Sequence, residues 1–220
     1  MISRLPKWVE FGAFILAGVA GIINVVGLLG FEHQSISHLS GTATVLGSQL
    51  SDAGNSTTLH LAGVLLSFML GAAVSGFFLP GDTLKLGRNY GFLLLLESLL
   101  LLLSVYFLSQ NLIYGHYSAS AACGIQNALA TRYSGAIIRT THVTGVFTDL
   151  GIILGAKCRG ERFDKRRAVL MLLIITGFIL GGWFGAYVFH RIQFYTLLVP
   201  ALICLLLAGS YKFYATHADA

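Results

Sequence analysis

A polar motif with the pattern His-x-[Ser/Thr]-Gly-x-x-Thr-x-Leu-Gly occurs twice in this chain. The first copy lies in SHLSGTATVLG at 37–47, and the second lies in THVTGVFTDLG at 141–151. Hydroxyl side chains cap helix starts, and a helix start carries a partial positive charge that attracts anions. Two such helix starts meeting inside a protein would form a binding site for an anion or another polar solute.

The first copy supplies the candidate site residues His38, Ser40, Gly41 and Thr44. Spacings of three and four residues place side chains on neighbouring faces of one helix. We expect Ser37 to cap the start of this helix and Gly41 to permit close approach of another backbone. The first copy therefore predicts one half of a polar site.

The second copy supplies the candidate site residues His142, Thr144, Gly145, Thr148 and Asp149. We expect Thr141 to cap its helix start. Arg139 lies just before the helix, and Asp149 lies two turns along it. If Arg139 reaches the site, the balance of charge favours a small anion. If Arg139 stays at the surface or pairs with Asp149, a neutral polar solute is favoured instead.

A shorter duplication lies on the apolar segments that precede the two motifs. The stretch Gly-Ile-Ile-Asn at 21–24 recurs as Gly-Ile-Gln-Asn at 124–127. Asn24 and Asn127 therefore occupy equivalent places, and we expect both to face the same interior, where each could bind solute or form an interhelical hydrogen bond. The repeat also argues against a cleaved signal peptide, because the first segment is half of a duplicated unit.

The composition identifies the class of protein. Of the 220 residues, 55% are hydrophobic and only 10% are charged, and the mean hydropathy is +0.77. Such a chain is too apolar for an ordinary soluble domain and is expected in a lipid bilayer. The net charge of +5 does not indicate a nucleic-acid partner, because the basic residues gather in short segments between apolar runs, most densely at 157–167.

Motifs of hydrolases, zinc proteases, P-loop proteins and Rossmann enzymes are absent from the sequence. We therefore predict that the protein is not an enzyme and that it has no cofactor and no metal site. The three cysteines do not have the spacing of a disulfide framework or of a zinc site.

Six apolar runs are long enough to cross a hydrocarbon core of ~30 Å, which takes ~20 helical residues. They lie at about 10–30, 58–79, 90–109, 112–131, 168–190 and 194–214. The polar motifs form short helices near 36–50 and 140–156, each between the first and second span of its half. We predict a single transmembrane domain at 1–220, with repeat 1 at 10–109 and repeat 2 at 112–214.

Two topologies compete, because the polar helices could either cross the membrane or dip in and return. Eight spans would put the loop with Lys85 and Arg88 opposite the loop at 157–167, whereas six spans put the basic segments on one side. Three spans per half give the halves opposite orientations. We therefore predict an all-α polytopic membrane protein with six transmembrane helices in two inverted 3+3 repeats. Each repeat has a short broken or re-entrant polar helix, and both termini are cytoplasmic.

The motif copies also carry a family resemblance. The stretch at 40–47, the Gly-Ile-Gln-Asn-Ala at 124–128 and the Thr-Thr-His-Val-Thr-Gly at 140–145 resemble the YoaK-like family of bacterial integral membrane proteins, a domain of unknown function. The resemblance covers nearly the whole chain and implies a multi-pass protein of the bacterial cytoplasmic (inner) membrane. This chain has Asn24 and Thr42 where such proteins often have an acidic residue and an asparagine.

Two functions from different classes are consistent with these features. The first is a small-solute channel or secondary transporter, with a site for a polar or anionic solute between the repeats. The second is a non-transporting scaffold or binding protein for a lipid, a partner or a metal. A water-lined passage to His38 and His142 would favour transport, and a dry, hydrogen-bonded centre would favour the scaffold. Besides the bilayer, the sequence leaves open a homo-oligomer.

Overall fold

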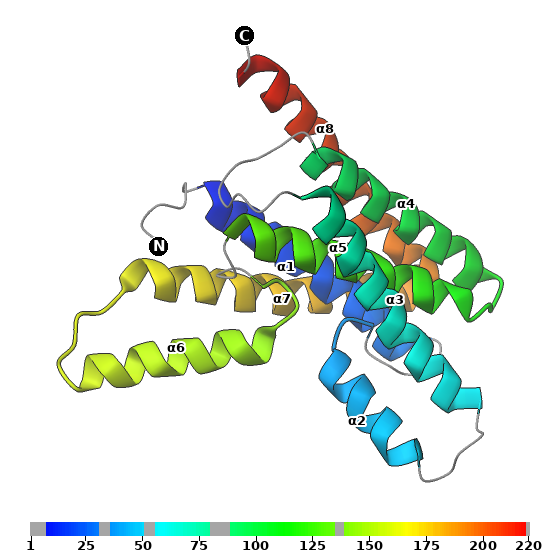
Figure 1. Cartoon of the computed structure of the whole chain (residues 1–220), viewed down its shortest axis with the longest axis horizontal. Helices are drawn as coiled ribbons and strands as arrows, with labels where there is room; N and C mark the ends of the chain where they lie inside the picture. Colours follow the sequence, from blue (N-terminus) through cyan, green and yellow to red (C-terminus); the bar gives the residue numbers. More distant parts are fainter. Residues whose placement is uncertain (1–7, 31–35, 51–55, 80–88, 135–138, 219–220) are drawn as a thin grey trace.

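The computed structural model describes residues 8–30, 36–50, 56–79, 89–134 and 139–218. Within these ranges the regular structure is helical, which confirms the predicted all-α class (Figure 1). The helices are α1 (Trp8–Leu29), α2 (Leu39–Gln49), α3 (Ser56–Phe78), α4 (Asn89–Ser109), α5 (Tyr114–Ser134), α6 (Val143–Cys158), α7 (Lys165–Ile192) and α8 (Leu198–Ala218), with a short 3-10 helix, η4 (Gln193–Leu197), before α8.

Within the described ranges, four stretches are long and apolar enough to cross a membrane. They are Trp8–Leu29, Thr57–Phe78, Asn89–Ser109 and Lys165–Tyr211. The last stretch has 47 residues and contains α7 and the part of α8 up to Tyr211; the two helices are separated where Gln193 adopts a φ of 51°. The chain is therefore a membrane protein. The predicted span at 112–131 corresponds to α5, which is not among the four because its serine, histidine and amide residues lower its hydropathy.

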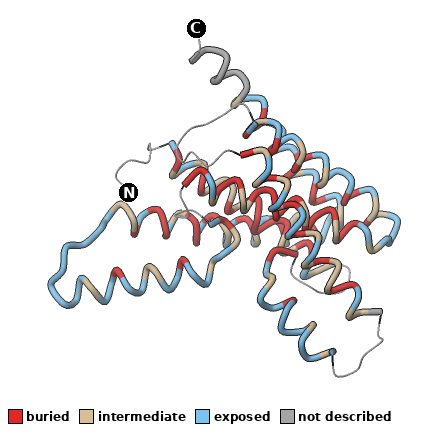
Figure 2. The backbone as a smooth tube through the Cα atoms, viewed as in Figure 1, coloured by how far each residue is buried: buried red, intermediate tan, exposed pale blue. Residues whose placement is uncertain are grey.

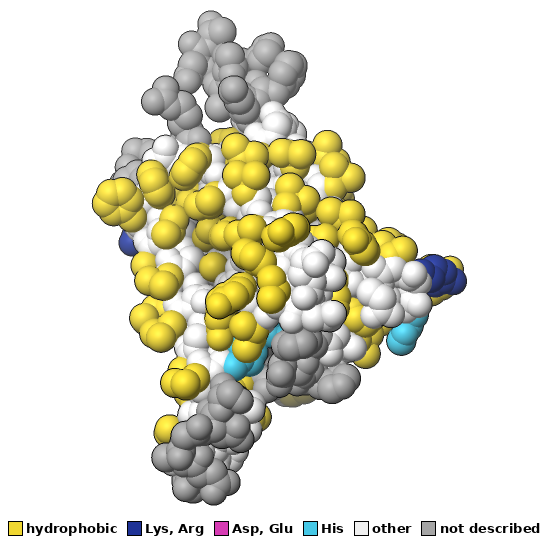
Figure 3. Space-filling model, turned by 90° about the vertical axis from the view of Figure 1, so that its right-hand side faces the viewer, with side chains coloured by type: hydrophobic (Ala, Val, Ile, Leu, Met, Phe, Trp, Pro, Cys, Tyr) yellow, Lys and Arg dark blue, Asp and Glu magenta, His cyan; other side chains and the backbone are white. Residues whose placement is uncertain are grey.

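The surface of the long helices agrees with this assignment. On the face drawn in Figure 3, hydrophobic side chains cover most of the described surface, and Lys and Arg side chains lie at its margins. Large exposed apolar residues occur on each long helix, for example Phe11, Phe77 and Trp183 at 67%, 84% and 67% exposure. Such a surface is unfavourable in water and favourable against lipid chains.

Four aromatic residues gather at one end of the long helices, which we call the aromatic end. The ring centroid of Tyr133 lies 5.8 Å from that of Trp8 and 5.9 Å from that of Tyr90, and Tyr211 lies 6.1 Å from Tyr90. These residues belong to the first turns of α1 and α4 and to the later turns of α5 and α8. The start of α1 and of α4 therefore meets the C-terminal part of α5 and of α8.

Polar contacts place the remaining long helices. Arg166 Nε donates to Glu10 Oε1 at 2.8 Å, so α7 begins at the aromatic end. Asn89 Nδ2 donates to the carbonyl oxygen of Phe78 at 2.6 Å, so α3 ends there. Consecutive long helices consequently run in opposite directions, and α1, α4 and α7 begin where α3, α5 and α8 end.

The tightest helix pairs are α1 with α7 and α5 with α3, and glycine makes both possible. A Cβ atom on Gly21 would overlap the carbonyl oxygen of Phe178 on α7. Likewise, a Cβ atom on Gly124 would overlap the carbonyl oxygen of Phe68 on α3. Small residues allow such approach where lipid supplies no hydrophobic drive for helix association. The glycine of the duplicated Gly-Ile-x-Asn stretch thus makes the same kind of close backbone contact on α1 and on α5.

The two polar motifs form helices α2 and α6, as predicted, and both lie on the outside of the long helices (Figures 1 and 2). Helix α2 packs against α3, and α6 packs against α7. Thr42 is the buried residue of α2, and Val146 and Ile153 are the buried residues of α6. Most other side chains of these two helices are exposed, in contrast to the largely buried α5.

Candidate functional site

His38 and His142 occupy the same structural position in the two halves. Each is the residue immediately before the first turn of its polar helix, with φ −90° and ψ 69° at His38 and φ −91° and ψ 55° at His142. The carbonyl oxygens accept the first helical bonds, from Thr42 N at 3.3 Å and from Val146 N at 3.2 Å. The sequence repeat therefore corresponds to a repeated backbone geometry.

The predicted caps, Ser37 and Thr141, are wrong. Histidine takes the capping position in both helices, and neither imidazole forms a capping hydrogen bond. Ser37 instead donates from its amide at 2.9 Å and from its hydroxyl at 3.1 Å to Oδ1 of Asn24. A hydroxyl bonded to the preceding span is no longer available to the helix start.

Each duplicated asparagine contacts the start of the polar helix that follows it. Asn24 accepts both bonds from Ser37, and Asn127 Nδ2 lies 3.4 Å from Nε2 of His142. An amide NH₂ donates, so the imidazole Nε2 accepts and the ring proton resides on Nδ1. Both asparagines are half-buried. Their contact is thus a helix-positioning hydrogen bond, one of the two roles that the sequence allowed.

The neutral form of His142 is favoured. The residue is exposed, but the cavity partly encloses its ring; this partial burial lowers its pKa below the usual 6.5, and the positive charge of Arg139 lowers it further. This direction agrees with the hydrogen bond from Asn127, which requires an unprotonated Nε2. The histidine is therefore an acceptor on one side and a donor on the other at neutral pH.

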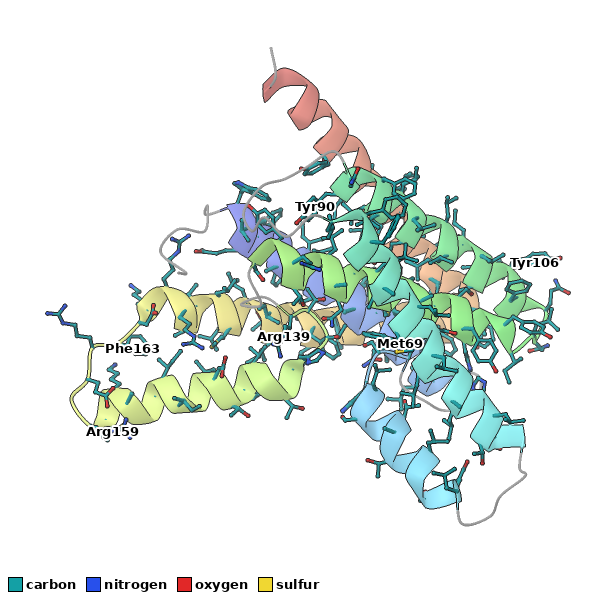
Figure 4. All side chains as sticks on the ribbon, in the orientation of Figure 1. Met69, Tyr90, Tyr106, Arg139, Arg159 and Phe163 are labelled. Atoms are coloured by element: carbon teal, nitrogen blue, oxygen red, sulfur yellow. The ribbon has the colours of Figure 1, made fainter. Side chains whose placement is uncertain are left out.

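A cavity of about 280 Å³ opens between the first half of α6 and the first three turns of α7. Its described lining consists of Arg139, His142, Gly145, Val146, Asp149, Arg167, Leu170, Met171 and Ile174. Figure 4 shows the labelled Arg139 close to the start of α6. Three candidate site residues of the second motif therefore share one cavity with Arg139. The described lining contains no residue of the first half.

The ion pair in this cavity differs from the pair considered from sequence. Asp149 Oδ2 lies 3.1 Å from a terminal nitrogen of Arg167, on α7. Within the described part of the chain, no carboxylate lies within ion-pair distance of Arg139. The cavity thus has two guanidinium groups, one carboxylate and a neutral imidazole, which gives it a net charge of +1.

Arg167 also retains a buried donor. Its Nε atom is buried and has no acceptor among the described residues, although the terminal nitrogen of the same group pairs with Asp149. A buried unsatisfied donor is unfavourable and is a natural contact for a bound acceptor. In the sequence, Arg167 ends a basic segment typical of a loop, so no local pattern indicates that it reaches the cavity.

The hydroxyl groups of the two candidate threonines at equivalent motif positions bond to the backbone of their own helices. Thr44 Oγ1 donates to the carbonyl oxygen of Ser40 at 2.8 Å, and Thr148 Oγ1 donates to that of Thr144 at 3.0 Å. Such bonds to the preceding turn are common for threonine inside helices. His38, Ser40 and Gly41 lie exposed on α2, away from the described lining of the cavity.

The polar side chains of α5 form a different kind of centre. Ser120 Oγ donates to the carbonyl oxygen of Val64 at 2.9 Å. Gln126 Nε2 donates to the carbonyl oxygen of Leu16 at 2.7 Å and to Thr140 Oγ1 at 3.1 Å. These bonds connect α5 to α3 and α1, and the side chains that form them are buried. They hold helices together rather than line an opening.

A buried histidine pair was also missed. His116 Nδ1 lies 3.2 Å from His60 Nε2, and His60 Nδ1 lies 3.3 Å from the hydroxyl of Tyr117. Both histidines are 3% exposed. Sequence position alone put each of them near the end of a span, where a histidine is ordinary, and nothing in the spacing indicated that α3 and α5 would bring them together.

One comparison with known proteins gives a match. The sequence model of a family described as protein of unknown function (DUF1275) matches residues 12–210. This range includes both polar motifs and every residue that lines the cavity. No curated protein and no solved structure matches the chain.

Proposed function

Because the chain belongs to the DUF1275 family of proteins of unknown function, we propose a function from its own geometry. We propose a small-solute channel or secondary transporter of the bacterial inner membrane. Its polar site includes the cavity at the start of α6, whose described lining belongs to the second repeat, and it takes a small anion. We assign no catalytic residue and no cofactor.

The proposed topology is six transmembrane helices in two inverted repeats. Helices α1, α3 and α4 make up the first repeat, and α5, α7 and α8 make up the second. The alternating directions of these helices support the topology, because α1 begins at the end where α5 finishes. The equivalent contacts of Gly21 and Gly124 support it further. Duplicated halves of opposite orientation are a common architecture of secondary transporters.

The polar helices are proposed to be re-entrant. Helix α6 runs antiparallel to α7, since His142 lies in the same cavity as Ile174 and Asp149 pairs with Arg167. Ile174 is nine residues along α7 from Lys165, which corresponds to about 14 Å at ~1.5 Å per residue. That depth is close to the middle of a ~30 Å hydrocarbon core. A polar helix start at this depth requires a polar cavity.

The cytoplasmic side is proposed to be the aromatic end. Arg132 and the basic segment at 157–167 lie at or near this end of the molecule, and cytoplasmic loops are rich in Lys and Arg. Both termini would then be cytoplasmic. The loop with Lys85 and Arg88 lies outside the described residues.

The single observation that carries the choice of an anion is the separation of the two arginines. Arg167 pairs with Asp149, so Arg139 contributes uncompensated positive charge to the cavity. The start of α6 adds the partial positive charge of a helix N-terminus. This positive potential would attract an anion, whereas it would contribute little to the binding of a neutral solute.

Flux into liposomes tests this proposal. Purified protein is reconstituted, and uptake of small anions and of small neutral solutes is compared with that of empty liposomes. We expect anion uptake above the background, lost in Arg139→Glu and retained in Arg191→Gln, a control at the far end of α7. Anion flux equal to that of empty liposomes with passage of a neutral solute, or full flux in Arg139→Glu, would contradict the choice of an anion.

One observation favours the alternative, a non-transporting scaffold. The buried polar side chains of α5, such as Ser120 and Gln126, are satisfied by backbone carbonyls of other helices. A dry centre of this kind stabilises an assembly without conducting. The liposome assay separates the two functions, because a correctly folded scaffold would give background flux for both classes of solute.

A further inference from the structure

A second cavity, larger and apolar, lies at the aromatic end. This groove has a volume of about 490 Å³ and lies between α1, α4, α5 and α8. Leu16, Leu94, Leu129 and Leu207 form its walls, one from each helix. Helix α4 packs on α5 and α8, whereas α1 packs mainly on α7. The groove therefore forms where α1 diverges from the other three helices.

The groove is unfilled beside α1. A Cβ atom built on Gly12 would meet no heavy atom within 4 Å, although Gly12 lines the groove. By contrast, Gly18 and Gly21 further along α1 face the backbone of α7 at close range. Protein interiors seldom leave apolar space of this size empty, so an apolar occupant is expected here.

The length of the groove matches one leaflet of a bilayer. Its lining on α1 extends from Trp8 to Leu16. Eight residues correspond to about 12 Å at ~1.5 Å per residue, and half of a ~30 Å hydrocarbon core is ~15 Å. A single acyl chain that enters from the aromatic end would therefore lie along the groove for most of its leaflet.

The mouth of the groove is polar, aromatic and cationic. Trp8, Tyr90, Tyr133 and Tyr211 surround it, and tryptophan and tyrosine are the residues enriched at the level of lipid headgroups. Arg132 lies in the last turn of α5, immediately before Tyr133, so its guanidinium group is at the same end of the helices as the mouth. A guanidinium beside phenolic hydroxyls is suited to a phosphodiester.

We propose that this groove binds one phospholipid from the leaflet at the aromatic end, with an acyl chain between α1 and α8 and its phosphate near Arg132. The site is separate from the cavity at α6 and does not depend on transport. An acyl chain matches the apolar walls and the length of the groove, and a phosphate can bind the polar groups at its mouth. A free phosphate would leave the walls exposed, and a second copy of the chain would need to insert a side chain rather than a flexible tail.

Quenching of Trp8 fluorescence by a brominated phospholipid tests the proposal. The chain has two tryptophans, so Trp183→Phe leaves Trp8 as the reporter in the full-length protein. Delipidated protein in detergent is titrated with dibrominated phosphatidylglycerol or phosphatidylethanolamine. We expect saturable quenching that the unbrominated lipid of the same headgroup reverses. The same brominated chain as a methyl ester, which lacks phosphate, should bind at least tenfold more weakly.

Two substitutions locate the bound lipid. Gly12→Phe places a ring in the groove from a position where the Cβ atom itself meets no heavy atom within 4 Å, and we expect it to abolish saturable quenching. Gly76→Phe is the matched control, since Gly76 is also helical with nothing within 4 Å but lies on α3, outside the groove. Arg132→Gln should weaken binding about tenfold and leave binding of the methyl ester unchanged.

Four outcomes would overturn the proposal. Linear quenching that no competitor reverses would indicate simple partition into the micelle. Equal binding of the phospholipid and the methyl ester would remove the phosphate from the site. Unchanged quenching in Gly12→Phe, with size-exclusion elution like that of the control, would place the lipid elsewhere. If Gly12→Phe alone changes the oligomeric state and no lipid binds to the parent protein, the groove is an interface between copies of the chain.

Discussion

Asn127 Nδ2 lies 3.4 Å from Nε2 of His142, so the largely buried helix α5 is bonded directly to the start of α6. In the first half, Asn24 makes the corresponding connection to Ser37, one residue before His38. The asparagine thus binds the imidazole ring of His142 in one half, and the amide and hydroxyl of Ser37 in the other. The two halves share a backbone geometry but differ in the bonds that hold it.

This difference predicts unequal effects of replacing the two histidines. His142→Gln should keep expression and helix packing, because an amide can still accept from Asn127, yet we expect it to reduce anion flux at least tenfold by removing the ring from the cavity. His38→Gln should also reduce flux if the motifs are functionally equivalent. Liposome uptake measures both variants, and wild-type flux in the double variant would exclude histidine from the mechanism.

The pKa of His142 should respond to Arg139. Because the folded-state pKa lies below 6.5, the folded protein takes up this proton at a lower pH than the unfolded chain does. The contribution of His142 to stability is therefore fully present above pH 6.5 and decreases as the pH falls through the lowered pKa. Arg139→Gln should move the pKa back toward 6.5. Titration of labelled histidine by NMR measures this shift, and an unchanged pKa would contradict the proximity of the two groups.

Protonation of His142 should also strengthen anion binding. The added charge raises the net charge of the cavity from +1 to +2, so flux at limiting anion concentration should increase as the pH falls below 6.5. The control is His142→Gln, which has no titrating ring and should show a flatter profile between about pH 5 and 7. The same pH dependence in both proteins would assign the effect to another group.

The ion pair between Asp149 and Arg167 should matter for charge and little for stability. The side chains are 45% and 42% exposed, and exposed pairs contribute about 0–1 kcal/mol. Asp149→Asn should therefore lower the thermal unfolding temperature by only a few degrees at most, while it increases anion affinity by removing the one carboxylate of the cavity. A large loss of stability with no change in anion affinity would show that the pair is structural.

The two equivalent glycines, Gly21 and Gly124, should tolerate an added side chain equally poorly. Gly21→Ala and Gly124→Ala each place a Cβ atom against a backbone carbonyl oxygen, which forces two helices apart and should cost about 1–3 kcal/mol. Gly76→Ala is the control, because its Cβ atom meets nothing and alanine favours the helix. Thermal unfolding in detergent ranks the three variants. Tolerance at Gly21 with intolerance at Gly124 would argue against equivalent repeats.

Membrane topology can be tested with single cysteines after removal of the native ones. Cysteine at Asn55, Arg88 and Lys165 should react with an impermeant reagent from outside, inside and inside, respectively. The first two positions lie outside the described residues, but their sidedness follows from six spans. Reaction of positions 55 and 165 from the same side would exclude an inverted repeat.

The sequence alone determined the elements of this protein. Apolar runs of about 20 residues predicted helices at the positions of α1, α3, α4, α5, α7 and α8, because burial in lipid is a local property of each segment. The repeated polar motif predicted α2 and α6, and the repeated Gly-Ile-x-Asn predicted equivalent roles for Asn24 and Asn127. These predictions needed only the composition and period of short stretches.

The tertiary structure decided which residues meet. Arg167 rather than Arg139 pairs with Asp149, although the three residues come from neighbouring segments of the chain. His60 meets His116 at a sequence separation of 56 residues, and Gly21 meets Phe178 at a still larger separation. Such contacts depend on the relative rotation and depth of packed helices. Neighbouring small residues and interhelical hydrogen bonds fix that arrangement only after the chain has folded, so no local pattern could specify it.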